Sequence, residues 1–458
     1  MAKQVIRLGG GSAYEMDRIP PSVLLAEKGE LNYLCLDTLA ERTLGLAQQR
    51  KAANPAKGYN PMLERRVKAL WPACSKNGVK IISNMGAANP EAATARTLEI
   101  IQQIGTKSAK VATILGDDVR DIIKAINPKL WETGKPLKVL LDSIESDLVA
   151  ANVYLGAEPI VEALEKGADV VIGGRLADDA LFLAPMIYEF GWKTDDWAKK
   201  GRGTVITHLL ECSAFCSGGV FADPPYKIVP GLNNIGYPIA EVDKNGDGII
   251  TKVEGTGGLV TPATCKEQLI YETHDPANYL TPDVTADFRN VTFRQAGKDI
   301  VKVAGGTGKE RPSTLKVTLG VWEGYIGEGQ VGYAGADAYE HAKLCVEEMV
   351  KPFLEELKAK GEISETRIDY IGVNSLFGPA APEPKVPPNE VRLRVAARCK
   401  TREMAQFVGV EVGNFALMGP IGWGGATARA IPILGLFSAS IPREAVKPKV
   451  IIKEVKVK

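Results

Sequence analysis

Apolar residues follow two different spacings in the first 190 residues of the chain. Short apolar, β-branched runs predict strands at residues 4–8, 32–36, 79–83, 109–115, 137–141 and 169–172. Between these runs, apolar residues recur every three or four positions and predict helices at residues 39–50, 62–73, 91–104, 118–126 and 158–166. Because strands that alternate with helices of this length form crossover units, the pattern predicts an α/β domain with a mainly parallel sheet covered on both faces.

The pattern changes after the paired prolines Pro224 and Pro225, which interrupt any regular element. Residues 227–334 are rich in Gly, Thr, Val and Pro and contain short alternating runs, as in an antiparallel sheet. The elements predicted after them are a long helix at 337–360, strands at 368–373 and 391–397, a helix from about residue 402 and a strand-like basic tail. We therefore expect an α/β ligand-binding or catalytic domain in residues 1–225 and an α+β domain in residues 226–458.

Small and polar residues follow almost every predicted strand of the first domain. These strand-end segments are residues 9–14, Asp37, residues 84–90, residues 116–118, Asp142 and residues 173–178. Parallel strands bring such segments to one edge of the sheet, where open α/β sheets bind ligands. At any single position, a turn or helix cap is the competing interpretation. The residues predicted to hold the substrate's oxygen atoms are Gly10, Gly11, Ser12, Asn84, Asn89, Asp117, Gly218 and Gly219.

Charge and composition exclude several classes of protein. The 56 Lys and Arg residues nearly balance the 55 Asp and Glu residues and form no long block, which argues against nucleic-acid or membrane-surface binding. No apolar run reaches the roughly 20 residues that span a bilayer, and the N-terminus lacks a secretory signal. The seven cysteines are scattered rather than paired by spacing, so we expect a cytoplasmic protein.

Two motifs resemble ligand loops but lack the required context. The segment from Asp243 to Glu254 matches a calcium-binding EF-hand loop, yet neither flank has a helical pattern. Asn-Gly-Asp-Gly between two apolar runs is better interpreted as a hairpin turn, so we expect no calcium there. Residues 304–309 contain Gly-Gly-Thr-Gly-Lys but depart from the phosphate-loop pattern at Val303 and Glu310. No nucleotide cofactor is therefore expected.

Proton-transfer candidates lie near His208 and Arg175. His208, Cys212 and Cys216 are spaced to form one stripe on a helix, with Glu211 beside it. This stripe is interpreted either as a soft metal site or as a buried row of small side chains, and no metal is predicted. His208 or Glu211 is the better candidate, as a general acid or base.

Arg175 follows a predicted strand, and Asp178 comes three residues later. A guanidinium there could bind a substrate carboxylate while Asp178 orients it or moves a proton. The competing interpretation is an internal ion pair that stabilises the turn.

The combination of these motifs resembles the acyclic terpene utilisation protein family, AtuA, over about residues 4–440. The matching segments are residues 5–18, 37–43, 83–90, 116–118, 151–157, 167–178, 189–192, 208–212, 256–260, 268–272, 275–276 and 282–284. The chain departs from the family at Thr207, where Gly is usual, and at Cys216, where no Cys is expected. Both departures weaken the metal interpretation of the stripe.

The resemblance implies a role in breaking down acyclic terpenes, in pathways where acyl-CoA thioesters are carboxylated and hydrated. Our hypothesis is lyase or hydratase chemistry on a small carboxylate or acyl-CoA, in which Arg175 binds a carboxylate and Asp178, His208 or Glu211 moves the proton. The alternative is a non-catalytic or co-catalytic subunit of an acyl-CoA carboxylase or lyase complex. We expect a homo-oligomer, and by resemblance a separate small ferredoxin-like partner subunit.

Overall fold

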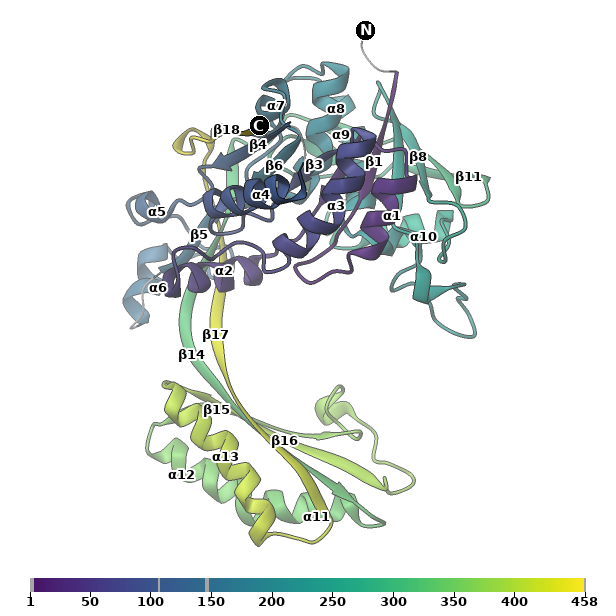
Figure 1. The fold of residues 1–458 in the computed structure, drawn as a ribbon. Coiled ribbons are helices and arrows are strands. Elements are labelled where there is room, and N and C mark those ends of the chain that lie inside the picture. Colours follow the sequence, from purple (N-terminus) through teal and green to yellow (C-terminus); the bar gives the residue numbers. More distant parts are fainter. Residues whose placement is uncertain (1–3, 106–107, 145–147, 457–458) are drawn as a thin grey trace. The chain divides into compact units, whose positions relative to one another are not determined.

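The computed structural model describes residues 4–105, 108–144 and 148–456. The described residues form two compact units (Figure 1). The first contains residues 4–142, 148–320 and 436–456, and the second consists chiefly of residues 321–435. The boundary predicted between residues 225 and 226 therefore lies inside the first unit. The reason is that strands after residue 226 pair with the N-terminal strand and extend the same sheet.

The first unit is built on a sheet whose centre is parallel. Its central strands are β1 (Val5–Gly10), β2 (Tyr33–Leu36), β3 (Lys80–Ser83), β6 (Val170–Gly173) and β4 (Ser108–Leu115), in this spatial order. All four pairings among them are parallel. Antiparallel strands flank this centre: β18 (Lys449–Lys456) beside β4, and β7 (Pro238–Asp243), β8 (Gly248–Lys252), β12 (Ile300–Ala304) and β11 (Thr292–Gly297) beyond β1. The prediction of a mainly parallel sheet is thus right for the centre and not for the edges.

Helices cover both faces of the parallel centre. One face packs against α1 (Pro20–Lys28), α3 (Leu63–Asn77) and α4 (Pro90–Ile104), and alternate strand residues such as Leu34, Ile81 and Val170 are buried beneath them. The other face packs against α7 (Glu158–Glu165), α8 (Asp178–Phe190) and α9 (Trp197–Glu211). Strand residues buried on both faces give the continuous apolar runs from which the strands were predicted.

The remaining elements of the first unit are shorter. They are α2 (Glu41–Ala53), α5 (Arg120–Ile126), α6 (Leu137–Ser143), β5 (Leu148–Val153), α10 (Pro262–Ile270), β9 (Tyr279–Leu280), β10 (Thr285–Asp287) and β13 (Thr307–Lys309). The strand predicted at residues 137–141 is wrong, since these residues belong to α6 and Asp142 lies inside that helix rather than after a strand. A run of five mostly apolar residues fits one helical turn as well as a strand, and its spacing alone does not distinguish them.

The calcium-like loop is a hairpin turn. Strands β7 and β8 pair in antiparallel fashion with Val242 opposite Gly248, so residues 243–247 close a short connection between them. The Asp243 carboxylate accepts a hydrogen bond from the Asn245 backbone at 2.7 Å. Both flanks are strands, which confirms the hairpin interpretation of this segment.

The second unit is an α+β sandwich. Its elements are β14 (Thr314–Ala334), α11 (Ala338–Cys345), α12 (Lys351–Ala359), β15 (Ile363–Ile371), β16 (Glu390–Cys399), α13 (Arg402–Met418) and β17 (Trp423–Pro442), and a π-helical turn at Val346–Val350 joins α11 to α12. The chain order is β-α-β-β-α-β, and the strand order is β15-β16-β14-β17. This is the arrangement of a ferredoxin-like domain. The predicted α+β region is present as the second unit, which the chain enters through β14 and leaves through β17.

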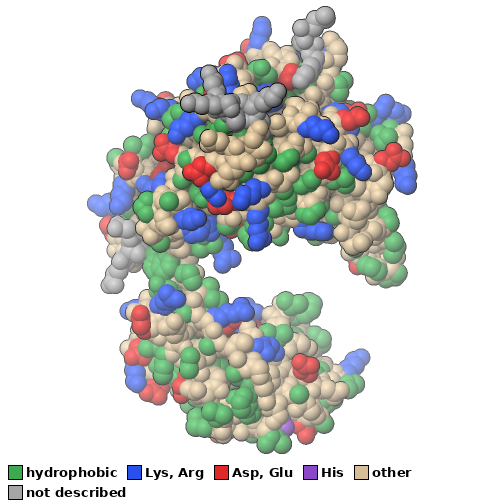
Figure 2. All heavy atoms as spheres, in the orientation of Figure 1, with side chains coloured by type: hydrophobic (Ala, Val, Ile, Leu, Met, Phe, Trp, Pro, Cys, Tyr) green, Lys and Arg blue, Asp and Glu red, His purple; other side chains and the backbone are tan. Residues whose placement is uncertain are grey.

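Surface charges on the face drawn in Figure 2 are interspersed, with Lys and Arg side chains next to Asp and Glu. In the part of the chain that the structure describes, no helix combines the length and the apolar character needed to cross a bilayer.

Candidate active site

The carboxyl ends of the parallel strands bring the predicted strand-end residues together. Gly10 pairs with Cys35, Leu36 with Ser83, Ser83 with Ile172, and Ile114 with Gly173, so the strands end almost level with one another. The polar residues that follow them therefore meet at one edge, as the sequence predicts. Direct hydrogen bonds then join Asp37 to Asn84 and Asp117 to Arg175.

Asn84 holds the Asp37 carboxyl in place. Its side-chain amide donates to Asp37 Oδ1 at 2.7 Å, while its own oxygen accepts from the Thr38 backbone at 2.8 Å. Burial and then the neighbouring Asp178 carboxylate raise the pKa of Asp37 well above its ordinary value, against the lowering effect of Arg175. Asp37 is thus a buried carboxyl with a strong tendency to hold a proton.

Asp117 fastens three strand ends. Its Oδ2 accepts hydrogen bonds from the Arg175 backbone and from the Asn152 side chain, both at 2.8 Å. A Cβ on Gly174 would lie 2.4 Å from Asp117 Oδ2, so only glycine lets the carboxylate come this close. Asp117 was predicted to bind substrate. In the structure its carboxylate accepts hydrogen bonds from the protein and holds the Arg175 backbone in place.

Arg175 is a buried cation at the centre of the edge, with 2% of its surface exposed. Its Nη1 donates to Asp178 Oδ1 at 2.6 Å and to the Leu39 carbonyl at 3.0 Å, and its guanidinium carbon lies 4.0 Å from the centre of the Tyr154 ring. The internal ion pair with Asp178, which was the competing interpretation of Arg175, is therefore present. Within the described residues, its buried Nε has no hydrogen-bond partner.

Three residues that were not predicted as site residues lie on this side of the site. The Tyr154 hydroxyl hydrogen-bonds to the Glu41 carboxylate, and Lys316 Nζ lies 3.1 Å from Glu41 Oε1. Burial alone would raise the pKa of Glu41, but Arg175, the Tyr154 hydroxyl and Lys316 together lower it to about 2. Glu41 is thus an ionised carboxylate held between two cations.

The end of α9 supplies the second half of the site. His208 is fully buried, and its Nε2 lies 3.1 Å from the Tyr271 carbonyl oxygen. Because a carbonyl only accepts, Nε2 must carry a hydrogen. Its Nδ1 lies 2.6 Å from Glu211 Oε1 and 3.2 Å from the Tyr279 hydroxyl. Nδ1 of the neutral ring is then an acceptor, so the 2.6 Å contact is a hydrogen bond when Glu211 carries the proton and donates it to Nδ1.

Electrostatics favour that neutral pair. Burial lowers the pKa of His208, although the Asp179 carboxyl opposes the shift. Burial and then the carboxylates of Asp178 and Glu272 raise the pKa of Glu211 well above its ordinary value. The proton between the two side chains therefore resides on Glu211.

Glu211 lies at the same edge as the strand ends. The Ser213 hydroxyl donates to the Gly10 carbonyl at 2.9 Å, and a Cβ on Gly10 would lie 2.4 Å from the Leu210 carbonyl oxygen. The end of α9 therefore rests on the end of β1.

Asp178 raises the pKa values of both Asp37 and Glu211. We call Asp37, Asp178, Glu211 and Glu272 the acid cluster. Asp37 and Glu211 are buried, whereas Asp178 is 34% exposed and Glu272 is exposed, so the cluster runs from the interior to solvent.

Other predicted residues serve the fold around the site. Ser12 accepts from Arg66 Nη1 at 2.7 Å, and Gly11 donates its backbone N–H to the Cys35 carbonyl. Asn89 caps α4 and donates to the carbonyls of Pro55 and Lys57 at 2.8 and 2.7 Å.

Gly218 and Gly219 follow α9 at the end of a 3-10 turn. A Cβ on Gly218 would meet Val229 and Leu259, and a Cβ on Gly219 would meet Ala214. None of these belongs to the acid cluster.

The cysteine stripe is broken. Helix α9 ends at Glu211 and a 3-10 turn follows at Ser213–Ser217, so Cys216 leaves the helical row. Its Sγ instead lies 3.6 Å from Cys265 Sγ in the core, as the buried-residue interpretation predicts. Among the described residues, no three His, Cys, Asp or Glu side chains are arranged to hold a metal ion.

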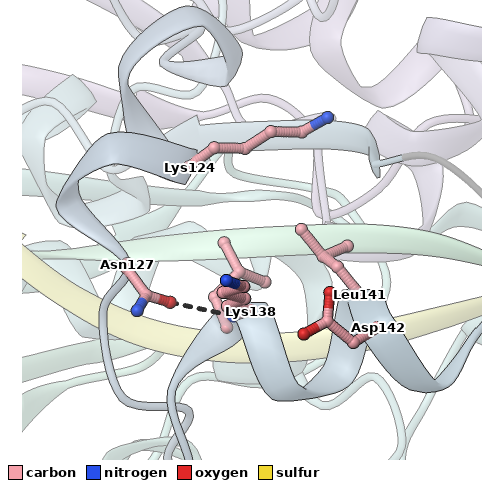
Figure 3. A pocket seen from close by; sticks show the side chains of 6 residues that line it. Lys124, Asn127, Lys138, Leu141 and Asp142 are labelled. Atoms are coloured by element: carbon pink, nitrogen blue, oxygen red, sulfur yellow. Dashed lines mark hydrogen bonds between the residues drawn. The ribbon is translucent and has the colours of Figure 1, made fainter.

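Two hollows lie outside the acid cluster. One, of about 220 Å³, lies between α5 and α6, where Asn127 accepts a hydrogen bond from the Lys138 backbone at 2.8 Å and Asp142 projects from α6 (Figure 3). The other, of about 470 Å³, is lined by residues 310–313 and Arg443.

Comparison with known proteins gives one extensive match. A family model described as "Acyclic terpene utilisation family protein AtuA" matches residues 6–452. No curated protein matches the chain significantly. Among solved structures, a crystal structure described as a "putative oxidoreductase" from Parabacteroides merdae is similar over 67% of this chain and 87% of that one, at 10% identity. Its TM-score of 0.09 is too low to support any argument about fold or function.

Proposed function

Because the chain belongs to the acyclic terpene utilisation family AtuA, we propose that it is a catabolic enzyme with lyase or hydratase chemistry. Its substrate would be a small carboxylate or an acyl-CoA thioester. The observation that carries the proposal is the Glu211–His208 contact of 2.6 Å, where a buried carboxyl holds a proton beside a ring of fixed tautomer.

Acid–base catalysis needs groups in opposite protonation states at the working pH. The acid cluster supplies them. Burial and the other carboxylates keep a proton on Glu211, whereas Asp178 forms an ion pair with Arg175 and reaches solvent. Glu211 would therefore act as the general acid and Asp178 as the general base.

The proposed hydration of an α,β-unsaturated thioester proceeds as follows. Asp178 takes a proton from water while the water oxygen bonds to the β-carbon, and Glu211 donates its proton to the α-carbon. The free Nε–H of Arg175 would hold the carbonyl oxygen, on which negative charge develops. After hydration, the proton on Asp178 returns to Glu211 through solvent. Elimination of water is the same sequence in reverse, and it starts with the proton on Asp178 and with Glu211 ionised.

His208 would be a positioning residue. It touches Glu211 rather than the reacting atoms, and the Tyr271 carbonyl fixes which ring nitrogen accepts. A glutamine at this position would lack the aromatic contacts with Tyr279 and Phe288, whose ring centres lie 5.0 and 5.8 Å away.

The test is turnover of a panel of enoyl-CoA thioesters and 2-hydroxy acids by the purified chain. Glu211→Gln and Asp178→Asn should each lower kcat about 10²- to 10⁴-fold, the usual contribution of one general acid or base. The exposed Glu91, on the first turn of α4, supplies the matched control Glu91→Gln, which should turn over like the wild type. Wild-type rates in both site variants would remove the acid cluster from the mechanism. Activity that appears only after a partner subunit is added would support the subunit alternative instead.

A further inference from the structure

Tyr279 is a polar residue beside the acid cluster that the proposed reaction leaves without a role. Its hydroxyl lies 3.2 Å from His208 Nδ1. The tyrosine comes from β9, a short strand paired with β10, and β10 packs against α9, the helix that carries His208. The same ring nitrogen lies 2.6 Å from Glu211 Oε1. Two side chains therefore compete for one nitrogen of His208.

Aromatic packing holds the Tyr279 ring in place. Its ring centre lies 4.8 Å from that of Phe288 and 5.0 Å from that of His208. Phe288 is buried and also stacks on His208, with ring centres 5.8 Å apart. These contacts fix where the hydroxyl oxygen lies, and a phenylalanine at position 279 would keep them.

Only one of the two side chains can be the main donor to His208. Nδ1 of the neutral ring has one lone pair, because Nε2 carries the ring hydrogen and faces the Tyr271 carbonyl. While Glu211 is protonated, its oxygen is the closer donor, at 2.6 Å against 3.2 Å for the Tyr279 hydroxyl. Tyr279 is then the weaker, second donor.

Glu211 cannot remain this donor throughout the proposed reaction. After it gives its proton to the substrate, its carboxylate only accepts, and the buried Nδ1 loses its donor at a cost in free energy. Protonation of the ring itself is opposed, because burial lowers the pKa of His208. The Tyr279 hydroxyl is within reach and keeps its hydrogen, because burial and then the Asp179 carboxyl raise its pKa well above the ordinary value.

We propose that Tyr279 is a positioning residue whose hydroxyl becomes the donor to His208 Nδ1 when Glu211 has released its proton. This inference rests on the proposed function, in which Glu211 is the general acid, and it names the group that supports the ionised state of that acid. Loss of the hydroxyl should make ionised Glu211 less stable and leave protonated Glu211 almost unchanged.

A Tyr279→Phe variant keeps the other charged and titratable groups that face Glu211 or Tyr279, so a change in the titration of Glu211 reports the lost hydroxyl. These groups are Asp37, Arg175, Asp178, Asp179, His208, Cys212 and Glu272.

The test is a titration of Glu211 from pH 5 to pH 11. It follows the protonated-carboxyl band in infrared difference spectra of each chain against the same chain with Glu211→Gln. The midpoint should lie about one pH unit higher in Tyr279→Phe than in the wild type, the equivalent of one hydrogen bond. Tyr226→Phe is the control and should titrate like the wild type, since Tyr226 is 86% exposed. Tyr279→3-fluorotyrosine, with a stronger donor, should lower the midpoint, and it decides if Tyr279→Phe fails to fold.

Equal midpoints in Tyr279→Phe and the wild type would overturn the inference. A wild-type band that persists to pH 11 would also overturn it, because Tyr279 would then not make the ionised state accessible. A wild type without the band would reject the inference and the proposed general acid together.

The titration needs no turnover, so a raised midpoint in an inactive chain would support this inference and reject the proposed reaction. In an active chain, Tyr279→Phe should lower kcat about tenfold, the rate equivalent of one pH unit, and leave KM unchanged, because Tyr279 touches His208 rather than the substrate.

Discussion

The protonated state of Glu211 predicts how the stability of the chain depends on pH. The pKa of Glu211 is raised above its ordinary value of 4.5 because the side chain is buried near other carboxylates. Between 4.5 and the raised value, the folded chain therefore holds one proton more than the unfolded chain at this site. The stability that this proton provides is fully present below pH 4.5 and is lost as the pH rises through the folded-state pKa.

Glu211→Gln should remove this dependence. Glutamine resembles the protonated carboxyl, because its amide can donate to His208 Nδ1 as the carboxyl does, but it does not ionise. Within the window, one extra proton changes the free energy of unfolding by about 1.4 kcal/mol per pH unit. The variant should therefore gain about 3 kcal/mol relative to the wild type over two pH units.

Urea unfolding followed by circular dichroism at pH 5, 6, 7 and 8 measures this difference. Glu91→Gln should give a curve parallel to the wild type, since Glu91 is exposed. A constant difference between Glu211→Gln and the wild type across the series would show that Glu211 is already ionised, and the assignment of the proton would be refuted.

Two further predictions concern the residues that hold the site. Gly174→Ala should lower the free energy of unfolding by about 1–3 kcal/mol, because its Cβ would lie 2.4 Å from Asp117 Oδ2. Gly424→Ala is the control and should lower it less, because a Cβ there would have no atom within 4 Å. Equal losses in the two variants would contradict the close approach of Asp117 to Gly174. Glu41→Gln should lower the free energy of unfolding at pH 7. This loss should shrink as the pH falls from 4.5 toward about 2, because the wild-type carboxylate becomes protonated over that range. A loss of stability that does not change with pH would contradict the lowered pKa of Glu41.

The parallel centre of the sheet could be predicted from the sequence because it depends on local signals. Buried strands appear as continuous apolar runs, and the turns after them require Gly, Asn or Asp, as at Gly174 and Asn84. The spacing of His208 and Glu211 also predicted that they share one side of a helix, and they are in contact.

The partners of these residues could not be predicted in the same way. Tyr271 and Tyr279 reach His208 from more than 60 positions later in the chain, and Lys316 reaches Glu41 across 275 positions. Such contacts depend on tertiary packing, and the spacing of apolar residues along the chain does not predict them.

The extent of the second unit was hidden for a related reason. β14 and β17 contain 21 and 20 residues and belong to both units, so no break in the sequence pattern marks where one unit ends. The paired prolines at residues 224 and 225, by contrast, interrupt only a loop within the first unit.

The account depends most directly on one proton, that of Glu211. Infrared difference spectroscopy at pH 7, comparing wild type with Glu211→Gln, detects it through the carbonyl band of a protonated carboxyl. The structure predicts that this band is present in the wild type, is lost in Glu211→Gln and is retained in Glu91→Gln. A wild-type spectrum in which only the band of an ionised carboxylate disappears on substitution would contradict the central claim.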